Sequence, residues 1–248
     1  MSSSIWTRCA GDSELRRLRV SPWRVVESQF QLSTRKLVDS AAEQELLEDL
    51  IDTAKPPAAS TRQHYLLTTP FRYPPLRHGS RLGTRSERGI WYGSESIATA
   101  FAEVAYYRLV FLDGARTDLG TVVTQHSAFT VRATGRGIDL TRPPFDAFRD
   151  RISSPSRYAD SQPLGAAMRE AGAEIVRYVS ARDPEGTNVG IFTPSVFGGA
   201  RPRALEPWYV AANRSMVEAV KRDYFGADRL VFPRSRFLVR GNLPAPAT

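Results

Sequence analysis

The order of strand-like and helix-like runs is the feature that most limits the folds open to this chain. Runs rich in β-branched and aromatic residues predict strands, and apolar residues three and four apart predict helices. The predicted strands cover residues 23–26, 89–93, 120–134, 229–233 and 236–240. The predicted helices cover residues 39–55, 97–111, 161–172 and 212–224, with short pieces within 144–160. Because these runs follow no regular βαβ order, the predicted class is α+β, with mixed, mostly antiparallel sheets flanked by helices.

Turn residues predict how these elements connect. Residues 173–194 hold two β-rich runs joined by "RDPEGTN", which is typical of a hairpin. Gly172 is expected to end the helix before it. Residues 135–144, "GRGIDLTRPP", are predicted to turn the chain, and residues 65–88, rich in Pro, Gly and Arg, to be mostly irregular. With no internal repeat and no long linker, residues 1–248 are predicted to form a single domain.

Composition excludes several classes of protein. The 248 residues are 42% hydrophobic, enough apolar surface for a substantial core, and no apolar run is long enough to span a bilayer. The N-terminus lacks the apolar core of a signal peptide. The single cysteine, Cys9, excludes an internal disulfide, and the three histidines lie at no metal-ligand spacing. We therefore expect a cytoplasmic, reduced protein without a metal.

The positive charge of the chain comes almost entirely from arginine. Lys and Arg total 34 against 26 Asp and Glu, giving a net charge of +8, and lysine occurs only at Lys36, Lys55 and Lys221. The arginines are scattered singly, and no helix-turn-helix, finger or RNA-recognition motif is visible. Nucleic acid, a phosphorylated small molecule and an acidic protein are all compatible partners on charge alone.

The predicted helix 97–111 carries a carboxylate, Glu103, at the edge of its apolar stripe. The buried face of this helix is predicted from apolar residues at helical spacing, namely Ile97, Ala100, Phe101, Val104 and Tyr107. A boundary glutamate of this kind usually points into solvent. The small neighbours Ala100 and Ala102 would also let a ligand approach the carboxylate closely.

Four further places carry polar or charged side chains in unusual settings. Each has an ordinary structural explanation: an ion pair for Arg24 in "PWRVV", a solvated loop for the arginines of "FRYPPLRHGSRLGTR", core packing for Tyr92, and a turn cap for Ser180. Neither a glycine-rich phosphate loop nor a nucleophile elbow is present. Any chemistry must therefore come from arginine, tyrosine, serine and carboxylate side chains.

Taken in order, these stretches resemble the RES-domain family of bacterial toxins, named after an Arg, a Glu and a Ser. The matching positions are Trp23-Arg24, the arginine loop from Gly79 to Arg85, Tyr92, Glu103, Gln162 and Ser180. The resemblance covers roughly residues 20–195, and residues 196–248 are expected to be a C-terminal extension packed on the same domain. It leaves open whether Arg24 or Arg81 is the leading arginine.

The resemblance implies a fold similar to ADP-ribosyltransferase toxins, with NAD⁺ as the substrate and no separate cofactor. The implied reaction is cleavage of the nicotinamide–ribose bond by hydrolysis or phosphorolysis. Transfer of ADP-ribose to a protein is the alternative, and a non-catalytic basic binding module is a third possibility. The implied catalytic residues are Glu103, Arg24, Tyr92 and Ser180, and the implied NAD⁺-binding residues are Arg81, Arg85, Tyr73, Gln162 and Asn188. The implied partner is an Xre/MbcA/ParS-like antitoxin that occludes the active site and makes any DNA contact itself.

Overall fold

The fold is built around one mixed sheet of ten strands. The computed structural model describes residues 4–28, 63–73, 75, 77–223 and 226–245, together with the single positions 40, 42, 43, 46 and 50. The strands are β1 (Arg16–Val20), β2 (Trp23–Glu27), β3 (Trp91–Ser94), β4 (Val122–Thr130), β5 (Ala133–Asp139), β6 (Ile175–Val179), β7 (Thr187–Ile191), β8 (Arg203–Ala212), β9 (Met216–Asp223) and β10 (Gly226–Pro233). The α-helices are α1 (Ile5–Arg8), α3 (Tyr65–Arg72), α4 (Ile97–Gly114), α5 (Arg149–Ile152) and α6 (Ser161–Glu170). Short 3₁₀ turns are η1 (Gly11–Glu14), η3 (Asp146–Phe148), η4 (Pro194–Val196) and η5 (Arg234–Phe237).

The sheet order is β1-β5-β6-β7-β3-β2-β4-β8-β9-β10, and β5 and β6 are the parallel pair among antiparallel neighbours. The predicted α+β class with mostly antiparallel pairing is therefore confirmed. The predicted hairpin within 173–194 is β6 and β7, and Gly172 has the positive φ of +77° expected after a helix end. The strands β8, β9 and β10 continue the same sheet beyond β4.

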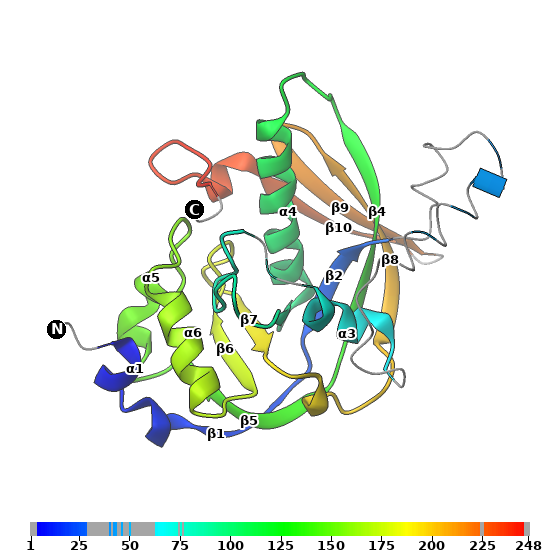
Figure 1. The fold of residues 1–248 in the computed structure, drawn as a ribbon. Helices are drawn as coiled ribbons and strands as arrows, with labels where there is room; N and C mark the ends of the chain where they lie inside the picture. The colour runs from blue at the N-terminus through cyan, green and yellow to red at the C-terminus, as the bar shows by residue number, and fades with distance from the viewer. Residues whose placement is uncertain are drawn as a thin grey trace.

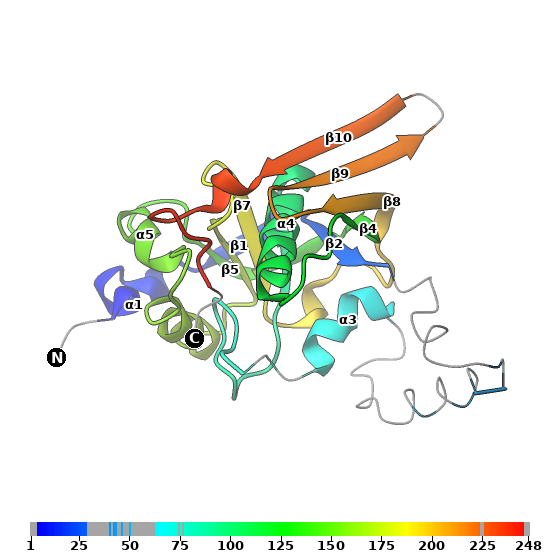
Figure 2. The ribbon, with the colours of Figure 1, turned by 90° about the horizontal axis from the view of Figure 1, so that it is seen from above.

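The sheet has two halves, β1-β5-β6-β7-β3 and β2-β4-β8-β9-β10. The chain passes between them from β1 to β2 and from β4 to β5. Two residues separate β1 from β2, and two separate β4 from β5, while β1 pairs with β5 and β2 with β4. In Figure 1, α4 lies against β2, β4, β9 and β10, and α1, α5 and α6 lie beside β5 and β6. Figure 2 shows the β9–β10 hairpin extending away from the body of the molecule. Between the halves, β2 and β3 share a single register pair, Trp23 with Ser94, so the sheet opens there.

Helix α3 occupies the first third of residues 65–88, and the prediction that this stretch is mostly irregular holds for its described residues from 73 onward. The His64 imidazole caps the helix by accepting the Leu66 N–H at 3.2 Å, and its apolar side chains pack into the core. Pro70 lies inside the helix and cannot donate to the Leu66 carbonyl. Trp91 Nε1 donates to that carbonyl instead, at 3.3 Å. This compensation comes from a strand far along the chain, so local sequence could not indicate it.

The C-terminal part contains two corrections. Residues 216–223 form strand β9 rather than the predicted helix, because this segment pairs with both β8 and β10, and alternate side chains such as Val217 and Ala219 are buried in the core against α4. The Asn213 carboxamide accepts the N–H groups of Ser215 and Met216 and fixes the turn into β9. Residues 236–240 are not a strand: β10 ends at Pro233, and a 3₁₀ turn then buries Phe237.

The predicted turn at residues 135–144 is also wrong in its first half, because β5 runs through it. A Cβ on Gly137 would lie 2.5 Å from the Ile175 carbonyl oxygen, so this glycine permits close approach of β6. The short helical pieces predicted within 144–160 are confirmed as η3 and α5. Most of the predicted helix 39–55 lies outside the described residues. Across the described helices, none is both long and apolar enough to cross a membrane.

Candidate functional site

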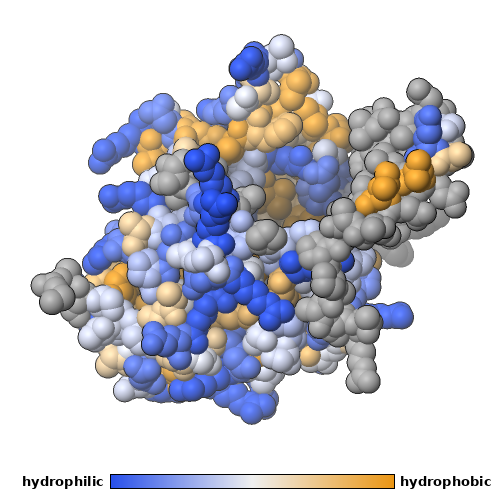
Figure 3. Space-filling model, viewed as in Figure 1, coloured by the Kyte–Doolittle hydropathy of each residue, from blue (hydrophilic) through white to orange (hydrophobic). Residues whose placement is uncertain are grey.

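A cleft of about 550 Å³ opens where β2 and β3 separate, between α4 and the loop of residues 78–81. The face of the molecule seen in Figure 3 is hollowed beside α4, with hydrophobic side chains above the opening and hydrophilic ones below it. Four arginines (Arg24, Arg81, Arg108 and Arg182) and two glutamates (Glu27 and Glu103) line this cleft. These charges leave a net +2 when the histidines are neutral, so the cleft favours an anionic ligand.

One face of α4 forms a wall of the cleft, and the opposite face is core. Ser96 caps the helix by accepting the Thr99 N–H at 3.0 Å. The cleft face has the helical spacing Ala100, Glu103, Val104, Tyr107, Arg108 and Phe111, and the buried face carries Phe101, Ala102, Ala105, Tyr106, Leu109 and Leu112. The predicted buried stripe was therefore wrong for Val104 and Tyr107, which face the cleft because the sheet opens beside them.

Two neutral donors hold the carboxylate of Glu103 inside the cleft. Ser180 Oγ and Asn188 Nδ2 each donate to Glu103 Oε1 at 2.6 Å. Asn188 is oriented in turn by Ser94 Oγ, which donates to Asn188 Oδ1 at 2.7 Å, and Ser94 faces Asn188 across the β3–β7 ladder. Among the described residues none donates to Glu103 Oε2, so one carboxylate oxygen is fixed and the other is available to a ligand.

Ser180 is the turn cap suggested by the sequence, and the same side chain also contacts Glu103. Its Oγ accepts the N–H groups of Arg182 and Asp183 at 3.0 and 3.1 Å, which caps the turn after β6. The same hydroxyl donates its proton to Glu103. With only 3% of Ser180 exposed, the turn and the carboxylate are rigidly coupled.

Arg24 lies on the floor of the cleft, and the structure does not pair it with a carboxylate. Its Nη1 donates to the Tyr92 carbonyl at 2.6 Å, and its guanidinium lies 5.3 Å from the Trp91 ring centre. Burial lowers the pKa of Arg24 to about 10. Its Nε is buried without a partner among the described residues. A desolvated guanidinium that has no carboxylate partner is costly unless an anion binds to it.

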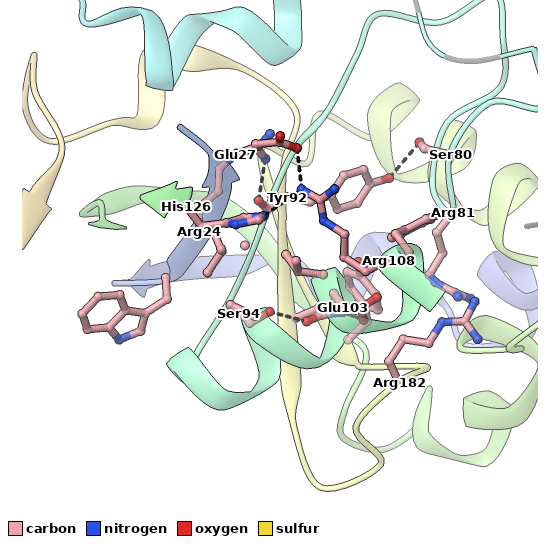
Figure 4. Close-up of a pocket in the computed structure, with 18 of the residues that line it drawn as sticks. Arg24, Glu27, Ser80, Arg81, Tyr92, Ser94, Glu103, Arg108, His126 and Arg182 are labelled. Carbon is pink, nitrogen blue, oxygen red and sulfur yellow. Dashed lines mark hydrogen bonds and ion pairs between the residues drawn. The ribbon is translucent and has the colours of Figure 1, made fainter. Parts of the chain in front are cut away.

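Tyr92 anchors the loop that closes one side of the cleft. Its hydroxyl lies 2.9 Å from Ser80 Oγ and accepts the Leu82 N–H at 3.2 Å. Gln162, at the start of α6, donates to the carbonyls of residues 78, 80 and 83 at 2.9–3.3 Å. Burial raises the pKa of Tyr92 to about 12, so the hydroxyl stays protonated. Figure 4 shows the Tyr92 side chain between Arg24 and the Ser80 loop.

Arg81 and Arg182 form the basic end of the cleft near Glu103 (Figure 4). Arg81 is 8% exposed and donates to the carbonyls of Ile152 and Ser154 at 3.1 and 2.9 Å. Arg182 donates to the Pro155 carbonyl at 2.8 Å, and its guanidinium lies 3.3 Å from the Tyr106 ring centre. Both cations are therefore held rigidly by backbone and aromatic contacts.

The structure brings together most of the residues named from the sequence, but not all. Glu103, Arg24, Tyr92, Arg81 and Asn188 line the cleft, with Ser180 directly behind Glu103. Gln162 lies behind the 78–83 loop and supports it. Arg85 and Tyr73 do not line the cleft. Arg85 is exposed to solvent, and Tyr73 is 40% exposed.

Among the polar and charged cleft residues that sequence reasoning missed are Glu27, Arg108, His126 and Arg182. The signal for Arg108 was its position on the Ala100–Glu103–Tyr107 helical face, whereas Glu27 and His126 face each other across β2 and β4 and gave no local signal. In the described part of the chain, no group of three His, Cys, Asp or Glu side chains is placed to hold a metal.

The chain belongs to the RES domain family, whose profile matches residues 54–211, as the sequence resemblance predicted. This range contains Tyr92, Glu103 and Ser180, while Arg24 precedes it. No curated protein matches the chain. Among solved structures, the chain is similar to a chain of the M. tuberculosis MbcT–MbcA toxin–antitoxin complex, with 11% identity and a TM-score of 0.49 over 86% of this chain and 94% of that one.

Proposed function

We propose that this chain is the toxin of a toxin–antitoxin pair, and that it cleaves the nicotinamide–ribose bond of NAD⁺. One observation carries the proposal: a single carboxylate, Glu103, is fixed by Ser180 and Asn188 inside a cleft lined by four arginines. Membership of the RES domain family supports it, because RES-domain resemblance implies NAD⁺ as the substrate.

The proposed chemistry assigns Glu103 to the reacting ribose. As the bond to nicotinamide breaks, positive charge develops on the ribose, and a carboxylate in a partly desolvated cleft stabilises it. Ser180 and Asn188 hold Oε1 in place, so the carboxylate needs little reorganisation during the reaction. The free oxygen of Glu103 is then able to orient or deprotonate the attacking nucleophile.

The arginines of the cleft suit the pyrophosphate of the dinucleotide. A guanidinium donates two parallel hydrogen bonds to phosphate oxygens and does not deprotonate under physiological conditions. Arg24 has a buried Nε without a described partner, which makes it the strongest candidate for this contact. Tyr92 supplies the carbonyl that orients Arg24, and its ring forms part of the cleft wall.

A direct assay tests the proposal. Purified protein is incubated with NAD⁺ in the presence and absence of phosphate, and the products are identified by mass spectrometry. Free nicotinamide with ADP-ribose indicates hydrolysis, and ADP-ribose phosphate indicates phosphorolysis. A mass increase on an added protein indicates ADP-ribosyl transfer instead. No turnover under any condition would favour a non-catalytic binding module and overturn the proposal.

The same proposal includes a protein partner. A free NAD⁺-consuming enzyme would harm its host, so we propose an Xre/MbcA/ParS-like antitoxin that covers the cleft and excludes NAD⁺. The net positive charge of the cleft lining favours an acidic segment of that antitoxin. A bacterial growth assay with and without the neighbouring antitoxin gene tests this part.

A further inference from the structure

A separate charged cluster occupies another part of the cleft, away from Glu103 (Figure 4). Glu27 ends β2, and His126 faces it across the β2–β4 ladder. Arg108 reaches both from α4: its Nη2 donates to Glu27 Oε2 and lies 3.3 Å from His126 Nε2. All three residues line the cleft, but the cluster plays no part in holding Glu103.

The charges of this cluster cancel, in contrast to the basic end of the cleft. Burial, reinforced by the nearby charge of Arg108, lowers the pKa of His126 to about 4, so the imidazole is neutral near pH 7. Because Arg108 can only donate, the neutral imidazole accepts through Nε2. The Arg108 side chain is 19% exposed, whereas that of Glu27 is 57% exposed. A ligand at this end therefore meets the carboxylate more readily than the cation.

Exposed aromatic rings lie beside this cluster. Tyr107 and Phe111 follow Glu103 on the cleft face of α4 and are 48% and 57% exposed. A helix rises about 1.5 Å per residue, so Phe111 lies roughly 12 Å along α4 from Glu103. Exposed rings of this kind stack readily on the flat face of a purine base.

We infer that Glu27 is a specificity-determining residue that selects NAD⁺ over NADP⁺, an inference that rests on the proposed function. With the nicotinamide ribose at Glu103, the adenosine half extends along α4, with adenine against Phe111 and its ribose near Glu27. A carboxylate accepts a hydrogen bond from a ribose 2′-hydroxyl and repels a 2′-phosphate. Glu27 also neutralises Arg108, the cation that would otherwise attract that phosphate.

Measuring kcat/KM for NAD⁺ and NADP⁺ tests the inference. We expect the wild-type protein to prefer NAD⁺, and we expect Glu27→Gln to reduce that preference by about tenfold or more. The neutral amide no longer repels the 2′-phosphate, and Arg108, freed from its ion pair with Glu27, is able to bind that phosphate. In the double variant Glu27→Gln/Arg108→Ala, the gained activity toward NADP⁺ should be lost again. The matched control is Glu218→Gln, which removes the ion pair between Glu218 on β9 and Arg229 on β10, outside the cleft lining.

Two outcomes separate failure of the inference from failure of the proposed function. A preference that changes less than twofold in Glu27→Gln, with NAD⁺ still consumed, would overturn the role of Glu27 alone. If the wild-type protein consumes neither dinucleotide, the proposed function fails. Calorimetry then measures the affinities for ADP-ribose and for ADP-ribose that carries a phosphate on the adenosine 2′-hydroxyl, which gives the same preference without turnover. Equal affinities for the two ligands would overturn the inference as well.

Discussion

Asn188 Nδ2 and Glu103 Oε1 are 2.6 Å apart, and Ser180 Oγ reaches the same oxygen at the same distance. Asn188 lies on β7, Ser180 follows β6, and Glu103 lies on α4, so the β6–β7 hairpin fixes a helical carboxylate. Hydrogen bonds to a charged acceptor are stronger than those between neutral groups. These two hydrogen bonds therefore fix the position of the Glu103 carboxylate in the cleft.

Glu103→Gln is predicted to abolish NAD⁺ consumption and to leave the fold intact. The amide oxygen still accepts the bonds from Ser180 and Asn188, but the negative charge is lost. Removing one electrostatic partner of a transition state costs about 10²–10³ in rate. Product formation by mass spectrometry and the melting temperature are measured together, with Glu218→Gln as the control. Wild-type turnover by a well-folded Glu103→Gln protein would rule out this role.

Ser94→Ala is predicted to lower kcat by a few fold with little change in KM. Ser94 is 2% exposed and donates to Asn188, so we expect it to act as a positioning residue for Glu103. Losing one neutral hydrogen bond costs about 1 kcal/mol. Steady-state kinetics give the split between kcat and KM, and Ser94→Thr should restore much of kcat because it keeps the hydroxyl. A change in KM alone would contradict a positioning role.

Sequence reasoning identified the individual chemical groups of the site better than their arrangement. The helix with Glu103, the strand with Tyr92 and the strand ending near Ser180 were predicted from local patterns and from a family resemblance. The pairing of Ser94 with Asn188 depends on the register of β3 against β7, which no local pattern specifies. Glu27 and His126 were missed for a similar reason, because their pairing depends on the register of β2 against β4.

The errors in predicted secondary structure share a physical cause. Residues 216–223 contain good helix formers but pair on both sides with neighbouring strands, so tertiary pairing overrides propensity. Helix α3 contains a proline whose lost hydrogen bond is replaced by Trp91, a distant residue. In each case a tertiary contact decides the structure: pairing with the flanking strands β8 and β10 for β9, and the side chain of Trp91 for α3.

Tyr92→Phe is predicted to destabilise the cleft loop. The phenol oxygen accepts the Leu82 N–H, and its loss leaves that buried donor without a partner. An unsatisfied buried donor costs about 1–3 kcal/mol. Urea denaturation measures the free energy of unfolding, and Tyr65→Phe, in a 49% exposed position, is the matched control. Equal stability of both variants would show that the hydroxyl does not hold the loop.

His126 is predicted to make the protein less stable as the pH falls from about 6.5 toward 4. Its pKa is lower in the folded state than in the unfolded state, so the unfolded chain binds a proton first in this window. Its stabilising contribution is complete above pH 6.5, and up to about 3 kcal/mol is lost by pH 4. The variant His126→Gln removes this titration while keeping an acceptor for Arg108.

Urea denaturation at about pH 7.5 and about pH 4.5 checks this prediction in both proteins. Asp113 and Asp160 also have lowered pKa values, because Arg234 and Arg151 donate to them. Their stabilisation is lost only as the pH falls below the ordinary carboxyl range, and it is shared by the wild type and the variant. A wild-type loss equal to that of His126→Gln would show that His126 does not cause it.

The final prediction concerns the proposed antitoxin. An acidic segment over the cleft would meet a lining with four arginines and the exposed rings of Tyr107 and Phe111. Aromatic side chains at such positions commonly dominate binding energy, and the charges mainly raise the association rate. Phe111→Ser should therefore speed dissociation, whereas added salt should slow association, because screening weakens electrostatic steering.

Growth arrest in a bacterial host, with NAD⁺ falling before ATP, should follow expression of the toxin and be reversed by its antitoxin. Surface plasmon resonance on the purified pair separates the two rates, and an NAD⁺ cleavage assay with added antitoxin measures inhibition. Because the proposed antitoxin and NAD⁺ occupy the same cleft, inhibition should be competitive with NAD⁺. An antitoxin that binds tightly without slowing cleavage would show that control lies outside the Glu103 cleft.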